Sequence, residues 1–208
     1  TSIGTSAFEG CTSLTSLTVP SGVTSMRNNA FKGCTGLSGV RITSIAAWCG
    51  IDFESELANP LTEVHKLYNY GRLVTDLTIP SSVRSIGAYA FAGCTPLTSV
   101  TIPDTVTSIA PTAFLGCSAI EKATMPVALM SAVPKEALRT VVLTSGIALA
   151  DNAFDGYDAL VSVTLPGTMT SIGSNAFAGC ASLEEIVLPA ALATIGSRAF
   201  EDCTGLAS

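Results

Sequence analysis

The chain has few charged side chains and few basic ones. Lys, Arg, Asp and Glu make up 12% of the 208 residues, and ten basic against sixteen acidic residues give a formal net charge of -6. The basic residues do not cluster in the sequence. Neutralising phosphates requires grouped Lys and Arg, so this composition argues against a nucleic-acid partner and against a basic membrane-binding surface.

The sequence also has no long apolar run and no linker. No apolar stretch reaches the roughly 18 to 20 residues that a membrane-spanning helix needs, so we expect no membrane insertion within this chain. No Pro-rich or charged segment divides it, so we expect one domain over residues 1–208. Hydrophobic residues make up 48% of the chain. Ser and Thr must therefore supply much of the surface, which favours exposed β-structure over charged helices.

One five-residue motif recurs along the whole chain. Its pattern is Ala-Phe-x-Gly-Cys, and in two copies a Tyr or an Asp replaces one position. In the regular repeats the motif Phe residues are 23 residues apart, as from Phe8 to Phe31 and from Phe177 to Phe200. Such a fixed period indicates a solenoid, in which each unit stacks on the next to bury its apolar face. The copies lie at Ala7–Cys11, Ala30–Cys34, Ala90–Cys94, Ala113–Cys117, Ala153–Tyr157, Ala176–Cys180 and Ala199–Cys203.

In the regular repeats, the segment after the motif alternates apolar and polar residues and then reaches a proline, as in Leu17, Val19 and Pro20. Period-two alternation predicts a short strand, and proline ends it. Apolar residues at steps of three follow, then a Gly such as Gly173, which predicts tight 3₁₀-like turns on the far side and a bend at the Gly. We expect eight strands, near Leu17, Val40, Leu77, Val100, Ala123, Val141, Val163 and Ile186.

Two regions depart from the regular period. An insert at about residues 43–75 predicts a short helix or turns ending near Pro60, followed by a hairpin around Asn69, Tyr70 and Gly71. A shortened repeat lies at about residues 126–143. The sequence also begins and ends inside a repeat, so we expect a fragment of a longer protein.

The succession of strand, Pro, Ile-Gly, Ala-Phe and Cys resembles the BspA-like (Treponema pallidum type) class of leucine-rich repeats. The match extends over essentially the whole chain. The resemblance implies a solenoid of about eight rungs, with short parallel strands on a concave face and turns or 3₁₀ segments on the convex side. Members of the class are mostly secreted or surface-exposed proteins of host-associated bacteria, so the resemblance also implies such a protein. Several members are described as adhesins, which implies a binding role.

The cysteines and the single histidine are the first residues to consider for chemistry. Six of the seven Cys occupy one slot of the repeat, and Tyr157 stands in that slot as well, so we interpret them as buried hydrophobes. The alternative is disulfides between neighbouring rungs, which would join Cys11 to Cys34, Cys94 to Cys117 and Cys180 to Cys203. No C-x-x-C spacing indicates a metal site, and we expect no cofactor.

A Cys-His enzyme in the insert is a further alternative. Cys49, Asp52, Glu63 and His65 are close in sequence, but no known spacing connects them. We therefore expect no catalytic residues, and we expect His65 to pack or form a hydrogen bond at the edge of the hairpin. The aromatic residues of the insert, from Trp48 to Tyr70, either provide a rim for a partner or cover the core.

The outward positions of the strands are the better candidates for function. Threonine recurs there, and a Thr column is first of all a good β-surface. The competing interpretation is a recognition surface on the concave face. The predicted partner-binding residues are Arg41, Asp76, Thr78, Thr101, Lys122, Thr124, Thr164 and Glu185.

Two function classes therefore stand. The first is a monomeric, non-enzymatic surface module that binds a host protein, a glycan or another surface partner. The second is a structural spacer that projects another domain, which the Ser- and Thr-rich surface also suits.

Overall fold

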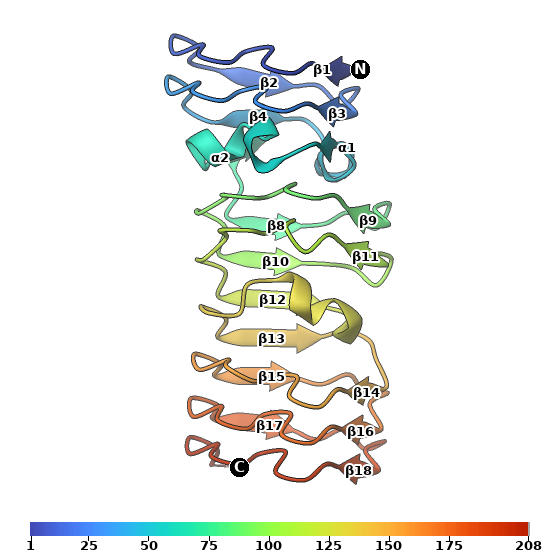
Figure 1. The fold of residues 1–208 in the computed structure, drawn as a ribbon. Helices are drawn as coiled ribbons and strands as arrows, with labels where there is room; N and C mark the ends of the chain where they lie inside the picture. Colours follow the sequence, from blue (N-terminus) through green and yellow to red (C-terminus); the bar gives the residue numbers. More distant parts are fainter. Residues whose placement is uncertain (208) are drawn as a thin grey trace. The chain divides into compact units, whose positions relative to one another are not determined.

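The computed structural model describes residues 1–207, which group into two compact units. Unit 1 comprises Thr1–Thr98 and Thr105–Ala119, and unit 2 comprises Ser99–Asp104 and the chain from Ile120 onward. Each unit is a β-solenoid with parallel strands and little helix, and the two contain about eight turns in all (Figure 1). That the chain is one domain stays a prediction.

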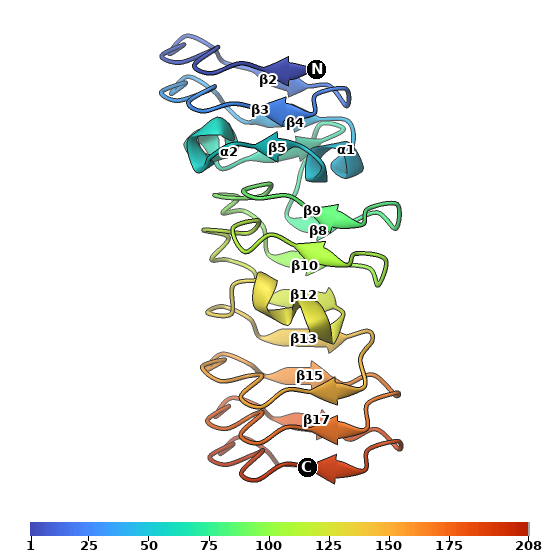
Figure 2. The same cartoon turned by 45° about the vertical axis from the view of Figure 1, so that its right-hand side comes forward.

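Each regular turn has a front strand of three or four residues and a back strand of two residues (Figure 2). In unit 1, β2, β4 and β6 pair in parallel, and β7 pairs antiparallel with β6. The back strands β1, β3 and β5 form one parallel sheet, and β9 and β11 another. The bounds are β1 Ser2–Ile3, β2 Leu17–Val19, β3 Ser25–Met26, β4 Val40–Ile42, β5 Asp52–Phe53, β6 Leu67–Asn69, β7 Arg72–Leu73, β8 Asp76–Thr78, β9 Ser85–Ile86 and β11 Ser108–Ile109.

Unit 2 has the same plan. Its front sheet is β10-β12-β13-β15-β17 and its back sheet is β14-β16-β18, with every pair parallel. The bounds are β10 Ser99–Thr101, β12 Lys122–Met125, β13 Thr140–Leu143, β14 Ala148–Leu149, β15 Ser162–Thr164, β16 Ser171–Ile172, β17 Glu185–Val187 and β18 Thr194–Ile195. All eight predicted strands are thus present, as β2, β4, β8, β10, β12, β13, β15 and β17.

The predicted tight turn after the proline is present, since Val83 N donates to Pro80 O at 2.9 Å, but Ile86, the next apolar residue of that pattern, lies on the back strand β9. The motif itself contains further turns. Cys34 N donates to Phe31 O at 3.1 Å, and Cys180 N donates to Phe177 O at 3.0 Å. The motif Gly residues have φ between 72° and 76°, a left-handed conformation that glycine adopts without strain. The two-residue back strands were not predicted, because two residues are too few to show an alternation.

Gly173 is required for a reason other than the predicted bend. Its φ is not positive, but a Cβ atom on it would lie 2.5 Å from Ala150 C of the preceding turn. The same position one turn later, Gly196, would meet the backbone of Ser174. Glycine therefore stands here because two turns of the coil approach closely.

The insert contains the predicted short helical segment before Pro60 and one further helix after it. Helix α1 (Ile45–Cys49) is capped by Ser44, whose side chain accepts a hydrogen bond from Ala47 N, and it ends at Gly50. A 3₁₀ helix, η1 (Glu56–Ala58), precedes a second short helix, α2 (Leu61–Val64). As expected, helical structure stops near Pro60, since η1 is C-capped by Asn59. Pro60 is also the N-cap of α2, where its missing N–H costs no hydrogen bond, and this second role was not predicted.

The predicted hairpin is confirmed. Tyr70 and Gly71 form the hairpin turn, with φ values of 48° and 78°, and both signs fit a two-residue type I′ turn. Its first strand, β6, also continues the parallel sheet by pairing with β4. In the shortened repeat, a 3₁₀ helix, η2 (Val127–Ala132), follows β12 in place of the motif turns.

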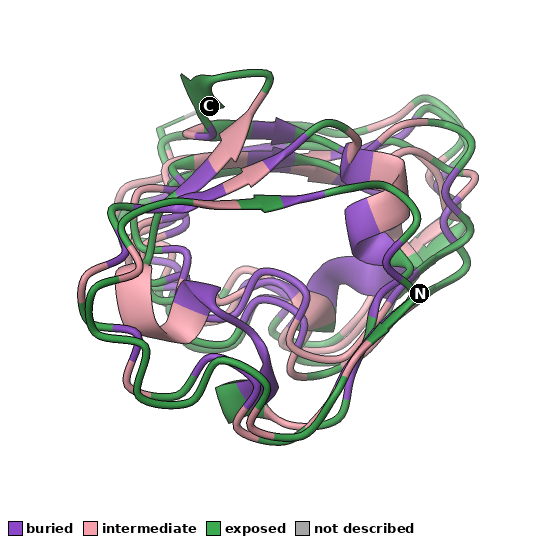
Figure 3. Ribbon diagram, turned by 90° about the horizontal axis from the view of Figure 1, so that it is seen from above, coloured by how far each residue is buried: buried purple, intermediate pink, exposed green. Residues whose placement is uncertain are grey.

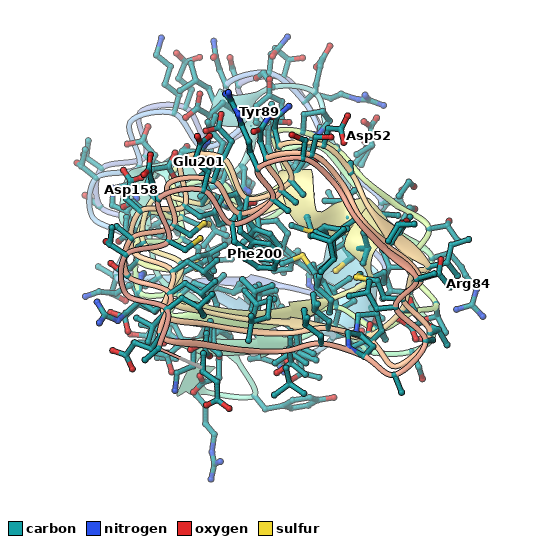
Figure 4. The ribbon with its side chains drawn as sticks, turned by 90° about the horizontal axis from the view of Figure 1, so that it is seen from below. Asp52, Arg84, Tyr89, Asp158, Phe200 and Glu201 are labelled. Atoms are coloured by element: carbon teal, nitrogen blue, oxygen red, sulfur yellow. The ribbon has the colours of Figure 1, made fainter. Side chains whose placement is uncertain are left out.

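The core of each unit is a column of stacked rings inside the coil, where the buried residues lie (Figure 3). Phe91 stacks on Phe114 at 5.3 Å between ring centroids in unit 1, and Phe154 stacks on Phe177 at 4.7 Å in unit 2. Phe200 points into the interior of its turn and stacks on Phe177 (Figure 4). These contacts confirm that the motif Phe fills the core.

Candidate functional site

The front face of unit 2 shows the alternation that the sequence predicts. We call the outward surface of the front strands the front face. Val100, Ala123 and Val163 are buried, and Thr101, Lys122 and Thr164 on the same strands are exposed. Glu185 is exposed and Thr124 is half-buried. Because successive side chains of a strand point to opposite sides, these residues share one surface.

The strand register arranges the front face of unit 2 in two columns. Thr101, Thr124 and Thr164 belong to one column, which Val142 and Val187 complete. Lys122 and Glu185 belong to the other, separated by Thr140 and Ser162. Three strand spacings of about 4.8 Å place the Lys122 and Glu185 backbones about 14 Å apart. Two isolated opposite charges therefore stand in a mostly uncharged hydroxyl surface.

In unit 1 the predicted residues lie on two front strands. Arg41 on β4 is half-buried, and its guanidinium carbon lies 5.3 Å from the centroid of the Tyr68 ring on β6. Asp76 and Thr78 on β8 are exposed. Asp76 Oδ2 accepts a hydrogen bond from Thr75 Oγ1 at 3.4 Å. That these residues bind a partner stays a prediction.

The sequence reasoning missed the neighbours of Arg41. Tyr68 pairs in register with Arg41, and Leu73 on β7 pairs in register with Tyr68. Lys66 is exposed and precedes the buried Leu67, so it lies on the same side as Tyr68. The alternation of Lys66, Leu67 and Tyr68 was visible in the sequence, but the parallel pairing of this hairpin with β4 was not.

The Trp, the His and a buried Asn of the insert donate hydrogen bonds to the turn that follows. In a regular turn, the motif Phe N–H donates to the Ala carbonyl of the next turn, as from Phe8 N to Ala30 O at 2.8 Å. The insert lacks this motif. Instead, Trp48 Nε1 donates to Ala90 O at 2.7 Å, and the fully buried Asn59 donates from Nδ2 to Tyr89 O at 2.6 Å.

His65 and two carboxylates also replace hydrogen bonds that the motif backbone makes in regular turns. His65 Nδ1 lies 2.9 Å from Gly93 O, and since a carbonyl only accepts, Nδ1 carries the proton. On the other side, Glu54 Oε2 accepts from Asn28 N at 2.9 Å, and Glu63 Oε1 accepts from Gly33 N at 3.0 Å. These side chains replace backbone groups of the missing motif.

The structure does not bring together the residues of the Cys-His hypothesis. Cys49 is buried, and Asp52 pairs with Arg27 at 3.1 Å on the surface. Glu63 and His65 are engaged by backbone groups of two different turns. A nucleophile needs a base within hydrogen-bond reach, which this arrangement does not provide. Trp48 is buried, which agrees with the interpretation that the aromatic residues of the insert cover the core.

The repeat cysteines are free thiols that bond to the preceding turn. All seven Cys are unpaired, so the inter-rung disulfides are not formed in this structure. Cys34 Sγ donates to Phe8 O at 3.0 Å, and Cys117 Sγ donates to Phe91 O at 3.1 Å. Burial raises the pKa of Cys117 to about 12 and that of Cys94 to about 11. Such thiols stay protonated at neutral pH and are poor nucleophiles.

Residues 1–207 contain neither a cluster of metal ligands nor a membrane-spanning helix. Over residues 1–207, no three His, Cys, Asp or Glu side chains gather as metal ligands would. A cavity of about 10 Å³ lies between β2, β4 and α1, room for about one water molecule. None of the described helices is long and apolar enough to cross a membrane.

Parallel front strands, tight turns and a repeated Leu, Phe and Cys core define a leucine-rich repeat protein. The family model for the BspA type leucine-rich repeat region matches this sequence in six copies, over residues 1–50, 64–141 and 135–208. The chain belongs to this family. The stretch left unmatched lies within the insert. No curated protein matches the chain.

Solved structures of bacterial leucine-rich repeat proteins are similar to this chain. One from Bacteroides ovatus is 27% identical with a TM-score of 0.59, and the match covers 98% of this chain and 56% of that one. A leucine-rich cell surface protein from Faecalibacterium prausnitzii is 26% identical with a TM-score of 0.43, over 92% of this chain and 46% of that one. The Treponema pallidum leucine-rich repeat protein is 20% identical with a TM-score of 0.37, over 100% and 72%. The chain thus spans a little over half the length of the Bacteroides ovatus protein.

Proposed function

We propose that this chain is a non-enzymatic binding module, secreted or displayed at a cell surface, that acts as an adhesin. It recognises a host protein, a glycan or another surface partner through the front face of its strands. One observation carries the proposal. The front face exposes residues that differ from turn to turn. The repeated Phe and Cys pack in the core, and the repeated Gly forms the turns.

The physical basis is the division of labour within each turn. The interior must be nearly identical from turn to turn for the coil to stack, so it cannot encode a specific partner. Arg41, Asp76, Lys122 and Glu185 interrupt a surface on which Ser and Thr are frequent and charged residues are few. Charges placed in such a surface select a partner by complementarity and by excluding wrong ones.

The experiment compares two variants with the same net change in charge. In the front-face variant, Arg41, Asp76, Lys122 and Glu185 are all changed to Ser. In the control variant, Lys32, Arg198, Asp158 and Glu201 are changed to Ser, and Asp158 and Glu201 point away from the interior on the turn side (Figure 4). Binding of labelled protein to extracellular-matrix proteins, mucin and a glycan array is then measured.

Wild type and the control variant are expected to bind the same partner, and the front-face variant is expected to lose about tenfold or more in affinity. Equal binding by all three would contradict the front-face proposal.

A structural spacer is the second candidate. It is favoured by the Thr101, Thr124 and Thr164 column, because threonine in register is also an ordinary stabilising β-surface. Absence of binding by the wild type on every surface tested would support this candidate.

A further inference from the structure

The outward residues of β4, β6 and β7 differ from the rest of the front face. We call Arg41, Lys66, Tyr68 and Leu73 the hairpin patch. Arg41, Tyr68 and Leu73 lie in register across the three strands. Leu73 is 39% exposed, and Tyr70, at the hairpin turn, is 77% exposed. The patch thus combines two cations with a half-buried aromatic ring and an exposed aliphatic side chain, in a chain whose net charge is -6.

Gly39 and Tyr68 hold the Arg41 side chain in place. A Cβ atom on residue 39 would lie 2.5 Å from Tyr68 Cε2, so the edge of the ring lies against the glycine backbone. The Arg41 guanidinium lies over the ring at 5.3 Å from its centroid, a cation–π contact. A side chain fixed before binding loses less conformational entropy when a partner arrives. The patch is therefore preorganised around Arg41.

One nitrogen of the Arg41 guanidinium lacks an acceptor among residues 1–207. Arg41 Nη1 is enclosed by protein and has no hydrogen-bond partner within the described residues. Its register neighbours on β2 and β6 are Thr18 and Tyr68, and neither carries a negative charge. A charged donor left without an acceptor is costly, and a carboxylate is the strongest acceptor for a guanidinium. Because Arg41 is only half-buried, a carboxylate of a partner can supply the guanidinium with an acceptor.

We infer that the hairpin patch binds an acidic, extended segment of a protein partner. One carboxylate of the segment meets Arg41, a second lies near Lys66, and an apolar side chain covers Leu73. A protein segment fits better than a sugar ring, because the guanidinium of Arg41 already occupies a face of Tyr68 on which a sugar would stack. The inference rests on the proposed function, since it assigns a partner class to one part of the front face.

The test uses two fluorescent decapeptides that alternate Glu or Gln with Thr and Leu. Fluorescence anisotropy with the full chain is expected to show binding of the Glu peptide about tenfold tighter than that of the Gln peptide. Arg41→Gln is expected to remove about tenfold or more of this affinity, and Lys66→Gln about threefold. Arg84→Gln is the matched control, because it removes the same charge from unit 1 at the residue before β9, where the side chain points away from the interior (Figure 4).

Tyr68→Leu provides a second measurement. It changes no charge but removes the ring that positions Arg41, so weaker binding of the Glu peptide by about threefold is expected. Circular dichroism melts verify that each variant is folded. Equal binding of the two peptides, no binding of the Glu peptide, or an unchanged affinity in folded Arg41→Gln would each overturn the inference.

A separate variant distinguishes failure of this inference from failure of the proposed function. A variant with Asp76, Lys122 and Glu185 changed to Ser, but with Arg41 retained, tests the remainder of the front face. If that variant loses the surface partner while the peptides never bind, the proposed function stands and the acidic-peptide inference is wrong.

Discussion

The regular turns and the insert satisfy the same backbone groups with different atoms. Between regular turns, main-chain N–H groups reach main-chain carbonyls, as from Phe154 N to Ala176 O at 2.8 Å. Around the insert, the indole of Trp48 and the amide of Asn59 donate instead, and carboxylates such as Glu63 accept. A repeat can therefore lose its motif and still stack, provided that side chains replace the missing main-chain groups.

Because of this difference, we expect the regular turns and the insert to tolerate different amino-acid substitutions. In a regular turn the bonding atoms belong to the backbone, so a substitution there acts through packing or close approach. In the insert the bonding atoms belong to particular side chains, so a substitution that preserves volume but removes the bonding atom is costly. The four predictions below test this distinction by unfolding in denaturant.

The largest effect is expected at Trp48. Trp48→Ala removes a buried ring and should lower the free energy of unfolding by about 3 to 5 kcal/mol, as Phe177→Ala should in a regular turn. Trp48→Phe keeps most of the packing but leaves Ala90 O with only the Asn59 contact at 3.4 Å, and we expect a loss of about 1 to 3 kcal/mol. A neutral Trp48→Phe in urea unfolding would show that the insert does not depend on this hydrogen bond.

The next effect is expected where regular turns approach closely. Gly173→Ala places a methyl group against the backbone of Ala150, and such overpacking typically costs about 1 to 3 kcal/mol. Gly167→Ala is the matched control, because no atom lies within 4 Å of its Cβ position. We expect Gly167→Ala to be neutral or stabilising. Similar losses in both variants would show that the effect arises from glycine's flexibility rather than from close approach.

Much of the fold could be predicted because it repeats. The period-two strands, the tight turns and the central Phe each recur in copies such as Leu160 to Pro166 and Leu183 to Pro189, so chance patterns were averaged out. The insert occurs once, and its pattern was ambiguous. Pro60 is compatible with either end of a helix, and only the tertiary position of α2 decides which.

The front face could be predicted as a set of outward residues but not as a set of neighbours. Alternation with buried residues is sufficient to place Lys122 or Thr164 on the surface. The contact between Arg41 and Tyr68 depends on β6 pairing with β4 over an irregular spacing, which no local signal encodes. The structural role of His65 was hidden for the same reason, because its acceptor, Gly93 O, belongs to the next turn.

A smaller effect is expected from the thiols of the regular motif as pH rises. Burial raises the pKa of Cys117 to about 12 in the folded chain, against 9.0 for an ordinary thiol. The folded state therefore keeps this proton above pH 9 while the unfolded state releases it. The stability that the neutral thiol provides is fully present below pH 9 and declines as pH rises toward 12, by about 1.4 kcal/mol at pH 10.

Comparison with Cys117→Ala isolates this contribution from other groups that titrate in the same range. The difference in unfolding free energy between wild type and variant should shrink by about 1.4 kcal/mol between pH 8 and pH 10. A difference that stays constant over this range would mean that the thiol is as accessible in the folded chain as in the unfolded one.

The smallest effect is expected at Glu63, where the insert contacts the turn before it. Glu63→Ala removes the acceptor of Gly33 N, and because this bond is only part-buried, water compensates for some of the loss and we expect about 0.5 to 1.5 kcal/mol. Glu63→Gln keeps an acceptor oxygen in the same place and should be close to wild type. Hydrogen exchange at the Gly33 amide locates the effect, since it should accelerate in Glu63→Ala but not in Glu63→Gln. Acceleration in both would mean that the negative charge, rather than the acceptor oxygen, holds the insert against the preceding turn.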